Sequence, residues 1–288
     1  MNSRVSGWIP RWRRANQMRR ALKSVVCLLF MAAFWLSSGP ATQALETPPF
    51  PFLYATLLVE TEVYSANLIE ETTQENTYWR RLTYDLAEQR ALVKTYRQPD
   101  EPQDLAPPHE VTLFEGTNQT QYRREAGRVM KSRGTFWMGD DNPLFAGRVI
   151  HGMNLAKIIE AASSEALGIR MVSQQELEAG PPYLPQRATL ILNEQQQVIR
   201  MESQSQEKLN EREWVWIEKT HEEAPFYYPV IARQRYEDPE SIFERRDRIH
   251  ALTIYASLPD EAFEMNVPAQ VQTQDMRQLL LPPAGLPR

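Results

Sequence analysis

The chain has 288 residues and carries 32 Lys and Arg against 37 Asp and Glu, which gives a net charge of −5 at pH 7. An acidic chain is poorly suited to hold nucleic acid or an anionic membrane surface by electrostatic attraction, so nucleic acid is excluded as a partner. The single cysteine excludes an internal disulfide and a thiolate metal site.

The N-terminus has the pattern of a secretory signal. Residues 1–24 contain seven basic side chains and no acidic one, and the apolar run VVCLLFMAAFWL (25–36) follows. These twelve residues fall short of the ~20 that a membrane-spanning helix needs. Small residues at Thr42 and Ala44 complete a cleavage site. We therefore predict a signal peptide over 1–44, whose removal leaves a net charge of −12 and no cysteine.

An exported chain of this kind is expected in the periplasm. Cys27 lies inside the apolar run, behind two valines rather than the small residues that a lipidation site needs, so we do not expect a lipoprotein. Two questions stay open: whether Arg19-Arg20 marks twin-arginine rather than Sec export, and whether Met1 or Met18 is the true start.

Prolines divide the remaining chain. ETPPFPF falls in a predicted linker over 45–52, and LPPAGLPR falls in a predicted flexible tail over 276–288. Proline-rich stretches of this kind punctuate folded segments. We expect one folded domain over 53–275.

Most of that domain has the pattern of β-strands. In YWRRLTYDL (78–86) apolar and polar residues alternate, which is typical of a strand with one wet face. The hairpin partner is RALVKTY (90–96). Further strands are predicted in EVTLFEG, TQYRREAGRV, ATLILNEQQQVIRMES, EWVWIEKT, YYPVIARQRYE and DRIHALTIYASL, between residues 110 and 258.

Two segments favour helices. NLAKIIEAASSEAL (154–167) has apolar residues at helical spacing and Gly168 as a stop. A shorter helix is predicted over 173–180. With about nine to eleven strands in successive hairpins, the fold class is mainly β (α+β). We expect a strongly curved antiparallel sheet, an unclosed β-barrel, with one or two helices on or in its concave face.

Signals for catalysis are weak, so we expect neither an enzyme nor a cofactor or bound metal. The sequence lacks a Gly-x-Ser-x-Gly elbow, a Ser-x-x-Lys pair and an HExxH helix. A metal-dependent hydrolase remains a distant alternative, using His221, Glu222 and Glu223 or the pair Asp140 and Asp141.

Aromatic and aliphatic residues are the more prominent feature. They could form an ordinary core, or they could leave the concave face partly empty and able to bind lipid. Burial of an acyl chain would stabilise a complex by about 0.8 kcal/mol per methylene without any catalytic group. The candidate lipid-binding residues are Tyr84, Phe114, Phe136, Trp137, Met138, Leu155, Ile158, Ile159, Trp214 and Trp216.

The C-terminal stretch LPDEAFEMNVPAQVQTQD (258–275) resembles the ending of the LolA/LolB/RseB-like superfamily of periplasmic lipoprotein-localisation factors. In that ending a strand leads into a Leu/Ile-Pro-Asp-x-x-Phe turn. Pro259 fixes φ and ends the strand, and Asp260 can accept hydrogen bonds from the turn. We expect Phe263 to enter the core and Val267-Pro268 to close the edge of the sheet.

The resemblance implies an unclosed β-barrel of about eleven strands, with helices lining a hydrophobic cavity that accepts lipid. It implies no enzymatic activity and no cofactor. We expect a carrier for a lipid or an acylated lipoprotein that acts as a monomer. Arg80 or Arg81 would be the arginine that tethers a lid helix. The alternative is a sensor or interaction module of the RseB kind that binds a membrane-protein partner.

Overall fold

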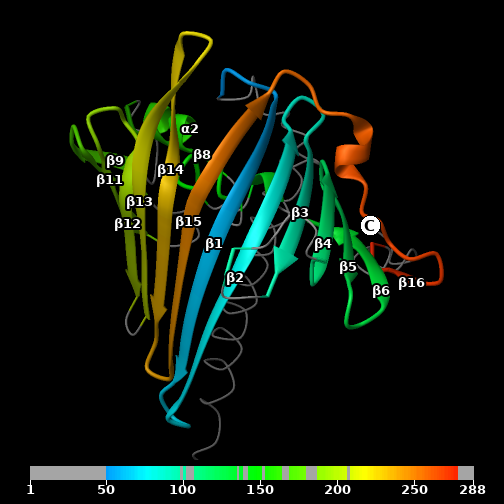
Figure 1. Ribbon diagram of the computed structural model, residues 1–288. Helices are drawn as coiled ribbons and strands as arrows, with labels where there is room; N and C mark the ends of the chain where they lie inside the picture. Colours follow the sequence, from blue (N-terminus) through cyan, green and yellow to red (C-terminus); the bar gives the residue numbers. More distant parts are fainter. Residues whose placement is uncertain are drawn as a thin grey trace, which may run out of the picture. The chain divides into compact units, whose positions relative to one another are not determined.

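The computed structural model describes most of the chain that follows the predicted signal peptide (Figure 1). The chain divides into two units, Met1–Thr47 and Pro48–Arg288, and all described residues belong to the second. The predicted signal peptide over 1–44 lies outside the described residues. In the described part of the second unit, no helix has the length and apolar character needed to cross a membrane. The described residues are 50–97, 100–101, 107–134, 136–138, 142–150, 153–163, 169–179, 187–205 and 208–277.

Fourteen strands form one sheet, in the order β16-β6-β5-β4-β3-β2-β1-β15-β14-β13-β12-β11-β10-β9. All neighbours in it are antiparallel except β16 and β6. The strands of this sheet are β1 (Tyr54–Asn67), β2 (Thr72–Asp85), β3 (Arg90–Tyr96), β4 (Glu110–Glu115), β5 (Asn118–Arg123), β6 (Arg128–Arg133), β9 (Ile169–Ser173), β10 (Glu176–Ala179), β11 (Ala188–Leu192), β12 (Val198–Ser205), β13 (Lys208–His221), β14 (Ala224–Glu237), β15 (Ser241–Tyr255) and β16 (Gln272–Asp275).

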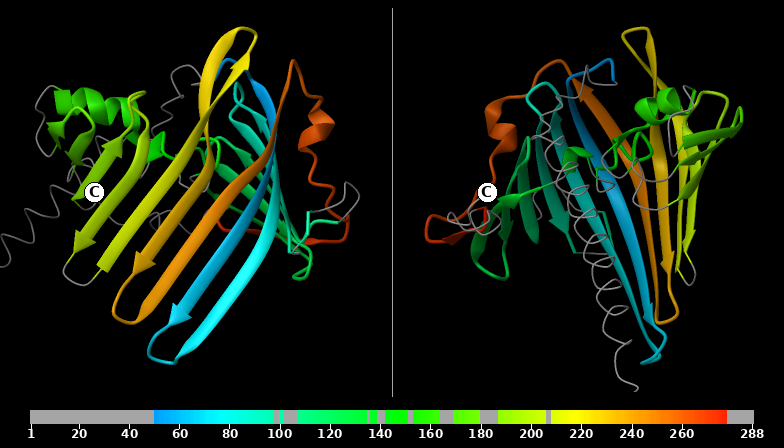
Figure 2. Two further views of the ribbon diagram at one scale, coloured as in Figure 1. Left: turned by 60° about the vertical axis from the view of Figure 1, so that its left-hand side comes forward. Right: turned by 180° about the vertical axis from the view of Figure 1, so that it is seen from behind.

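The sheet is curved and unclosed, as the sequence predicts: β16 and β9 form its two edges without pairing to each other. Figure 2 shows the sheet curling around the side that carries the helix α2 (Leu155–Ser163). We call this side the inner face and the opposite side the outer face. On β1, Ala55, Leu57, Val59 and Thr61 are buried on the inner face, while the residues between them are half exposed. This alternation follows from the two-residue period of a strand.

A single connection between β6 and β9 covers part of the inner face. It contains a short 3₁₀ helix, η1 (Phe136–Met138), the two-stranded ribbon β7 (Val149–Ile150) and β8 (Met153–Asn154), and α2. The helix predicted over 154–167 is confirmed over Leu155–Ser163. Its predicted end, including Gly168, lies outside the described residues. Asn154 caps its start, because its side-chain oxygen accepts a 2.8 Å hydrogen bond from the Ala156 amide.

The helix predicted over 173–180 is wrong. Residues Ile169–Ser173 and Glu176–Ala179 form the hairpin of β9 and β10. The reason is a contact between residues that are distant in the sequence. Leu177 pairs with Leu190 of β11, and both side chains are completely buried in the core beneath α2. An apolar strand partner thus overrides a local pattern that is compatible with a helical turn.

The C-terminal motif folds against the outer face. Asp260–Phe263 forms a 3₁₀ turn, η2, directly after Pro259. As expected, Phe263 is buried, and it packs against Leu92 and Val111. The sheet edge, however, is extended by β16, which pairs with β6, rather than closed by Val267-Pro268.

The sequence places residues 45–52 in a linker, but two of these residues join the core. Phe50 and Phe52 are only 6% and 4% exposed. Their rings stack 5.1 Å apart, and both contact Phe226 of β14. The two phenylalanines therefore fix the start of the domain against β14.

Candidate functional site

The connection over the inner face brings most of the predicted aromatic residues together. Tyr84, Phe136, Trp137 and Trp214 are each at most 6% exposed, whereas Phe114 and Trp216 are half-buried. The side chain of Met138 lies outside the described residues. Most of these aromatic groups therefore form the core between sheet and connection rather than the wall of an empty hollow.

The first aromatic group lies where η1 crosses β2 and β4. The rings of Phe114 and Phe136 stack with centroids 4.3 Å apart, and Phe136 also stacks on Tyr84 at 6.1 Å. The Tyr84 hydroxyl donates a 2.8 Å hydrogen bond to Asn142 Oδ1, also in the connection. Burial raises the pKa of Tyr84 far above its usual range, so this hydroxyl remains a donor at any physiological pH.

The second group lies beneath α2. Ile158 is completely buried, Leu155 is 7% exposed, and Ile159 packs partly buried against the same core. The core that they form with Trp214 and the inner residues of β10–β12 is apolar and closed. These three predicted residues therefore hold the helix to the sheet.

Gly147 and Arg148 fix the connection between the two groups. Gly147 has φ +75°, and a Cβ there would lie 2.8 Å from Trp216 Cζ2, so only glycine fits. The Arg148 guanidinium lies 4.9 Å from the Phe50 ring centroid and donates a 2.6 Å hydrogen bond to the Tyr227 carbonyl. Burial lowers the pKa of Arg148 to about 10, so the group stays charged at neutral pH.

Beside this packed region, a cavity of about 790 Å³ lies over the inner face of β1–β5 and β15. This volume falls within the roughly 300–1,000 Å³ of small-molecule sites. Of the predicted lipid-binding residues, Phe114 and Phe136 line it, together with Val93. Arg80 and Arg245 also line it. The cavity thus has an aromatic part and a cationic part, and uncharged polar side chains such as Thr112, Gln119 and Gln121 line much of the rest.

A buried ion-pair cluster forms the cationic part. Asp247 of β15 lies 2.9 Å from Arg80 Nη2 and 3.0 Å from Arg245 Nη2. The Thr61 hydroxyl donates a further 2.7 Å hydrogen bond to Asp247. Burial alone would raise the pKa of Asp247, but the two arginines and this hydrogen bond outweigh it and lower the pKa.

The two predicted lid-tether residues lie on opposite faces of β2. Arg80 points inward, and its ion pair with Asp247 joins β2 to β15. Arg81 occupies an outer register position opposite Lys94 of β3. The role of either residue as a tether for α2 stays a prediction.

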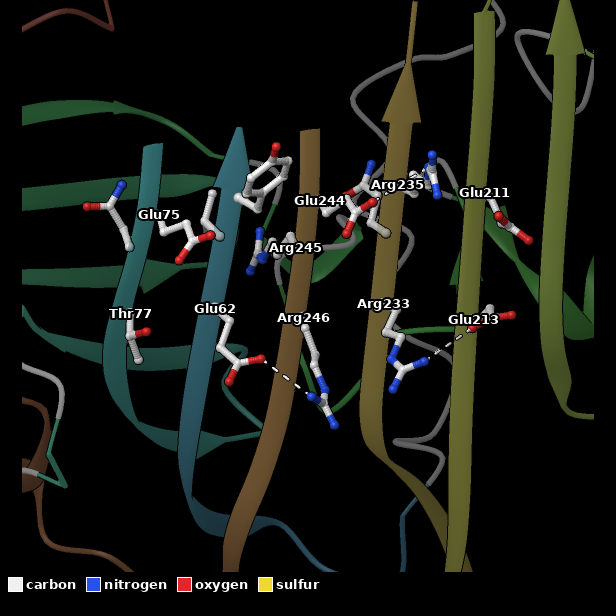
Figure 3. A pocket seen from close by; sticks show the side chains of 14 residues that line it. Glu62, Glu75, Thr77, Glu211, Glu213, Arg233, Arg235, Glu244, Arg245 and Arg246 are labelled. Carbon is white, nitrogen blue, oxygen red and sulfur yellow. Dashed lines mark hydrogen bonds and ion pairs between the residues drawn. The ribbon is translucent and has the colours of Figure 1, made fainter. Parts of the chain in front are cut away.

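A second hollow, of about 590 Å³, lies on the long strands β13–β15, β1 and β2. Figure 3 shows the side chains that line it. Its outer-face side chains are acids and arginines in cross-strand pairs. Glu62 lies 3.5 Å from Arg246, and Arg233 lies 3.8 Å from Glu213. Such paired surface charges are largely compensated, so this hollow is a weaker candidate than the inner cavity.

Among the described residues, no group of three or more His, Cys, Asp or Glu side chains could hold a metal ion. His221 contacts the Phe52 ring, with centroids 6.2 Å apart. Asp140 and Asp141, the other pair considered for a metal, lie outside the described residues.

Sequence reasoning missed Asp247, Arg245 and Arg148. Arg245 and Asp247 occupy alternate positions around the start of the strand predicted over 247–258, and Arg80, the other ion-pair partner of Asp247, lies across β1, far away in the sequence. The signal that could have found the cluster is an aspartate surrounded by arginines, in the run RRDR (245–248).

Comparison of the sequence with protein-family models and with curated proteins found no match. Among solved structures, the chain is similar to an outer membrane lipoprotein-sorting protein domain from Vibrio parahaemolyticus, with 14% identity and TM-score 0.41 over 74% of this chain and 90% of that one. It is also similar to a DUF1329 family protein from Desulfovibrio piger, with 10% identity and TM-score 0.40 over 75% of this chain and 92% of that one. A lipovitellin structure matches with 10% identity and TM-score 0.28, over 73% of this chain and 26% of that one.

Proposed function

We propose that the chain is an exported, periplasmic binding or carrier protein for a lipid or a lipid-modified protein, and that it performs no covalent chemistry. The observation that carries this proposal is the inner-face cavity, which joins an aromatic wall to a cationic wall. An amphiphile matches such a cavity, because its acyl chain and its headgroup need walls of opposite character.

The geometry of β2–β4 supports this assignment. Phe114 lies opposite Ala91 at the start of β3, whereas Thr95, near the end of the same strand, lies between Arg80 of β2 and Glu110 of β4. The character of the inner face therefore changes along β3 from aromatic to charged. An acyl chain would lie against Phe114 and Phe136, and the headgroup would lie toward Arg80.

Binding of a fluorescent fatty-acid probe to the mature chain tests the proposal. We expect saturable binding with one probe per chain. Gln121 lines the cavity from β5, so Gln121→Trp should fill part of it and weaken binding at least tenfold. The matched control is Thr120→Trp, which places the same side chain on the outer face of the same strand and should bind as the wild type does.

Absence of probe binding to the wild type would refute the proposal, as would equal loss in both variants. Isolation of a stoichiometric membrane-protein complex that contains no lipid would instead favour the sensor alternative. Native mass spectrometry of the chain purified from its own envelope distinguishes these two outcomes.

A further inference from the structure

We infer that the cationic part of the inner cavity recognises a phosphate-type anion carried by the amphiphile, with Arg245 as the contacting group and Asp247 as its positioning residue. This inference rests on the proposed function and adds the chemical class of the headgroup. It starts from the distribution of charge over the two faces of the sheet.

The inner face of β1–β6 and β15 carries more arginines than carboxylates, although the chain as a whole is acidic. Over β1–β6 and β15, register places four arginines on the inner face but only two carboxylates, Asp247 and Glu110. Glu110 already pairs with Arg123 at 3.0 Å. Glu75, which also lines the cavity, occupies an outer register position opposite Tyr64. The four arginines are Arg80, Arg123, Arg128 and Arg245.

Two of these arginines share one carboxylate. Arg80 and Arg245 both contact Asp247, so these three side chains together carry a net charge of +1. The side chains of Arg80 and Asp247 are each only 8% exposed. Burial of three charges is costly, and apolar residues of similar volume would often hold strands together as well or better. A cluster of this composition is therefore better explained by a ligand than by stability.

The position of the cluster fits a headgroup. Arg245 and Arg80 line the cavity together with Arg97, which follows the end of β3. Guanidinium groups offer planar sets of N–H donors that match phosphate oxygens. Asp247 accepts hydrogen bonds from Arg245 Nε at 3.3 Å and from Arg245 Nη2 at 3.0 Å. This two-point contact fixes the guanidinium plane before the ligand arrives.

Calorimetric titration of the full mature chain with three probes tests the inference: dodecyl phosphate, dodecyl maltoside and inorganic phosphate, each below its micellar concentration where it has one. We expect the wild type to bind dodecyl phosphate at least tenfold more tightly than dodecyl maltoside, which has the same acyl chain and an uncharged headgroup. Inorganic phosphate alone should bind much more weakly than dodecyl phosphate, because it lacks the acyl chain. The preference for dodecyl phosphate should shrink as salt is added.

Arg245→Gln should reduce the preference to less than about threefold while binding of dodecyl maltoside stays unchanged. Arg245→Lys keeps the charge but not the planar donors, so it should retain an intermediate preference. It replaces Arg245→Gln in the test if that variant proves unstable. The matched control is Arg246→Gln, which removes the next cation along β15, on the outer face. It should leave the preference intact.

Equal affinity for dodecyl phosphate and dodecyl maltoside would overturn the inference and leave the proposed function standing. Binding of neither would instead refute the proposed function. If inorganic phosphate bound as tightly as dodecyl phosphate, the site would belong to a free anion, and its assignment to a headgroup would be overturned.

Discussion

Arg80 on β2 reaches across β1 to form a 2.9 Å ion pair with Asp247 on β15. The pair links the middle strands of the sheet beside the inner cavity, which Arg80 also lines. Thr61, on the intervening β1, donates to the same carboxylate and accepts a 3.2 Å hydrogen bond from Arg80 Nε. The cluster therefore ties three strands together.

Asp247→Asn should lower the free energy of unfolding by about 3 kcal/mol, because two buried guanidinium groups lose their counter-charge. Urea denaturation of the variant and the wild type measures this loss. The control is Asp275→Asn, which breaks the exposed pair with Arg277 and should leave the denaturation midpoint unchanged. Identical midpoints for Asp247→Asn and the wild type would show that the cluster adds nothing to stability.

The stability difference between wild type and Asp247→Asn should depend on pH. The pKa of Asp247 is lower in the folded chain than the ~3.9 of an unperturbed aspartate. The contribution of the carboxylate is therefore fully present above about pH 4 and is lost as the pH falls through the folded pKa. Denaturation across the acid range up to neutral pH should show the two curves converging only at the acid end. A stability difference that is constant over this pH range would contradict a lowered pKa of Asp247 in the folded chain.

Gly147→Ala should destabilise the connection on the inner face. The new Cβ would meet the Trp216 ring at 2.8 Å, and φ +75° is strained for any L side chain. We expect the free energy of unfolding to fall by about 2–4 kcal/mol, together with faster proteolysis between residues 142 and 163. Gly127→Ala is the control for backbone strain alone, because Gly127 has φ +56° but open space where the new Cβ would lie. Equal effects of the two substitutions would show that contact with Trp216 is unimportant.

Phe263→Ala should lower the free energy of unfolding by about 3–5 kcal/mol, because it removes the ring that packs against Leu92 and Val111 on the outer face. The centroid of the same ring lies 4.1 Å from the Arg90 guanidinium carbon. Ile69→Ala, at a position that is 69% exposed, is the control and should change stability by less than about 0.5 kcal/mol. Thermal unfolding of both variants and of the wild type measures these changes in stability. A small change for Phe263→Ala would mean that η2 contributes little to holding the outer face together.

The sequence predicted the strands best where apolar and polar residues alternate, as in 78–86 and 90–96, and it predicted the burial of Phe263 from a local turn motif. It failed where partners distant in the chain decide the structure. Leu177 joins a strand because Leu190 offers an apolar partner, and Phe50 is buried because Phe226 lies beside it. Local patterns record neither relationship.

The candidate site was predicted only in part for the same reason. The sequence predicted aromatic residues on the concave face as a lipid site, but no local pattern shows that the connection fills part of that face with Phe136 and Trp137. The polar half of the cavity depends on register across β2, β1 and β15, and its charged residues are separated by most of the chain.

Photo-crosslinking tests most directly whether the inner cavity holds an acyl chain. The probe is an alkyl phosphate with a diazirine near the end of its chain, and peptide mass spectrometry locates the labelled residues. We predict labels on Val93, Phe114 and Phe136, which line the aromatic part of the cavity. Labels confined to exposed apolar residues of the outer face, such as Val215 and Ile217, would contradict the account.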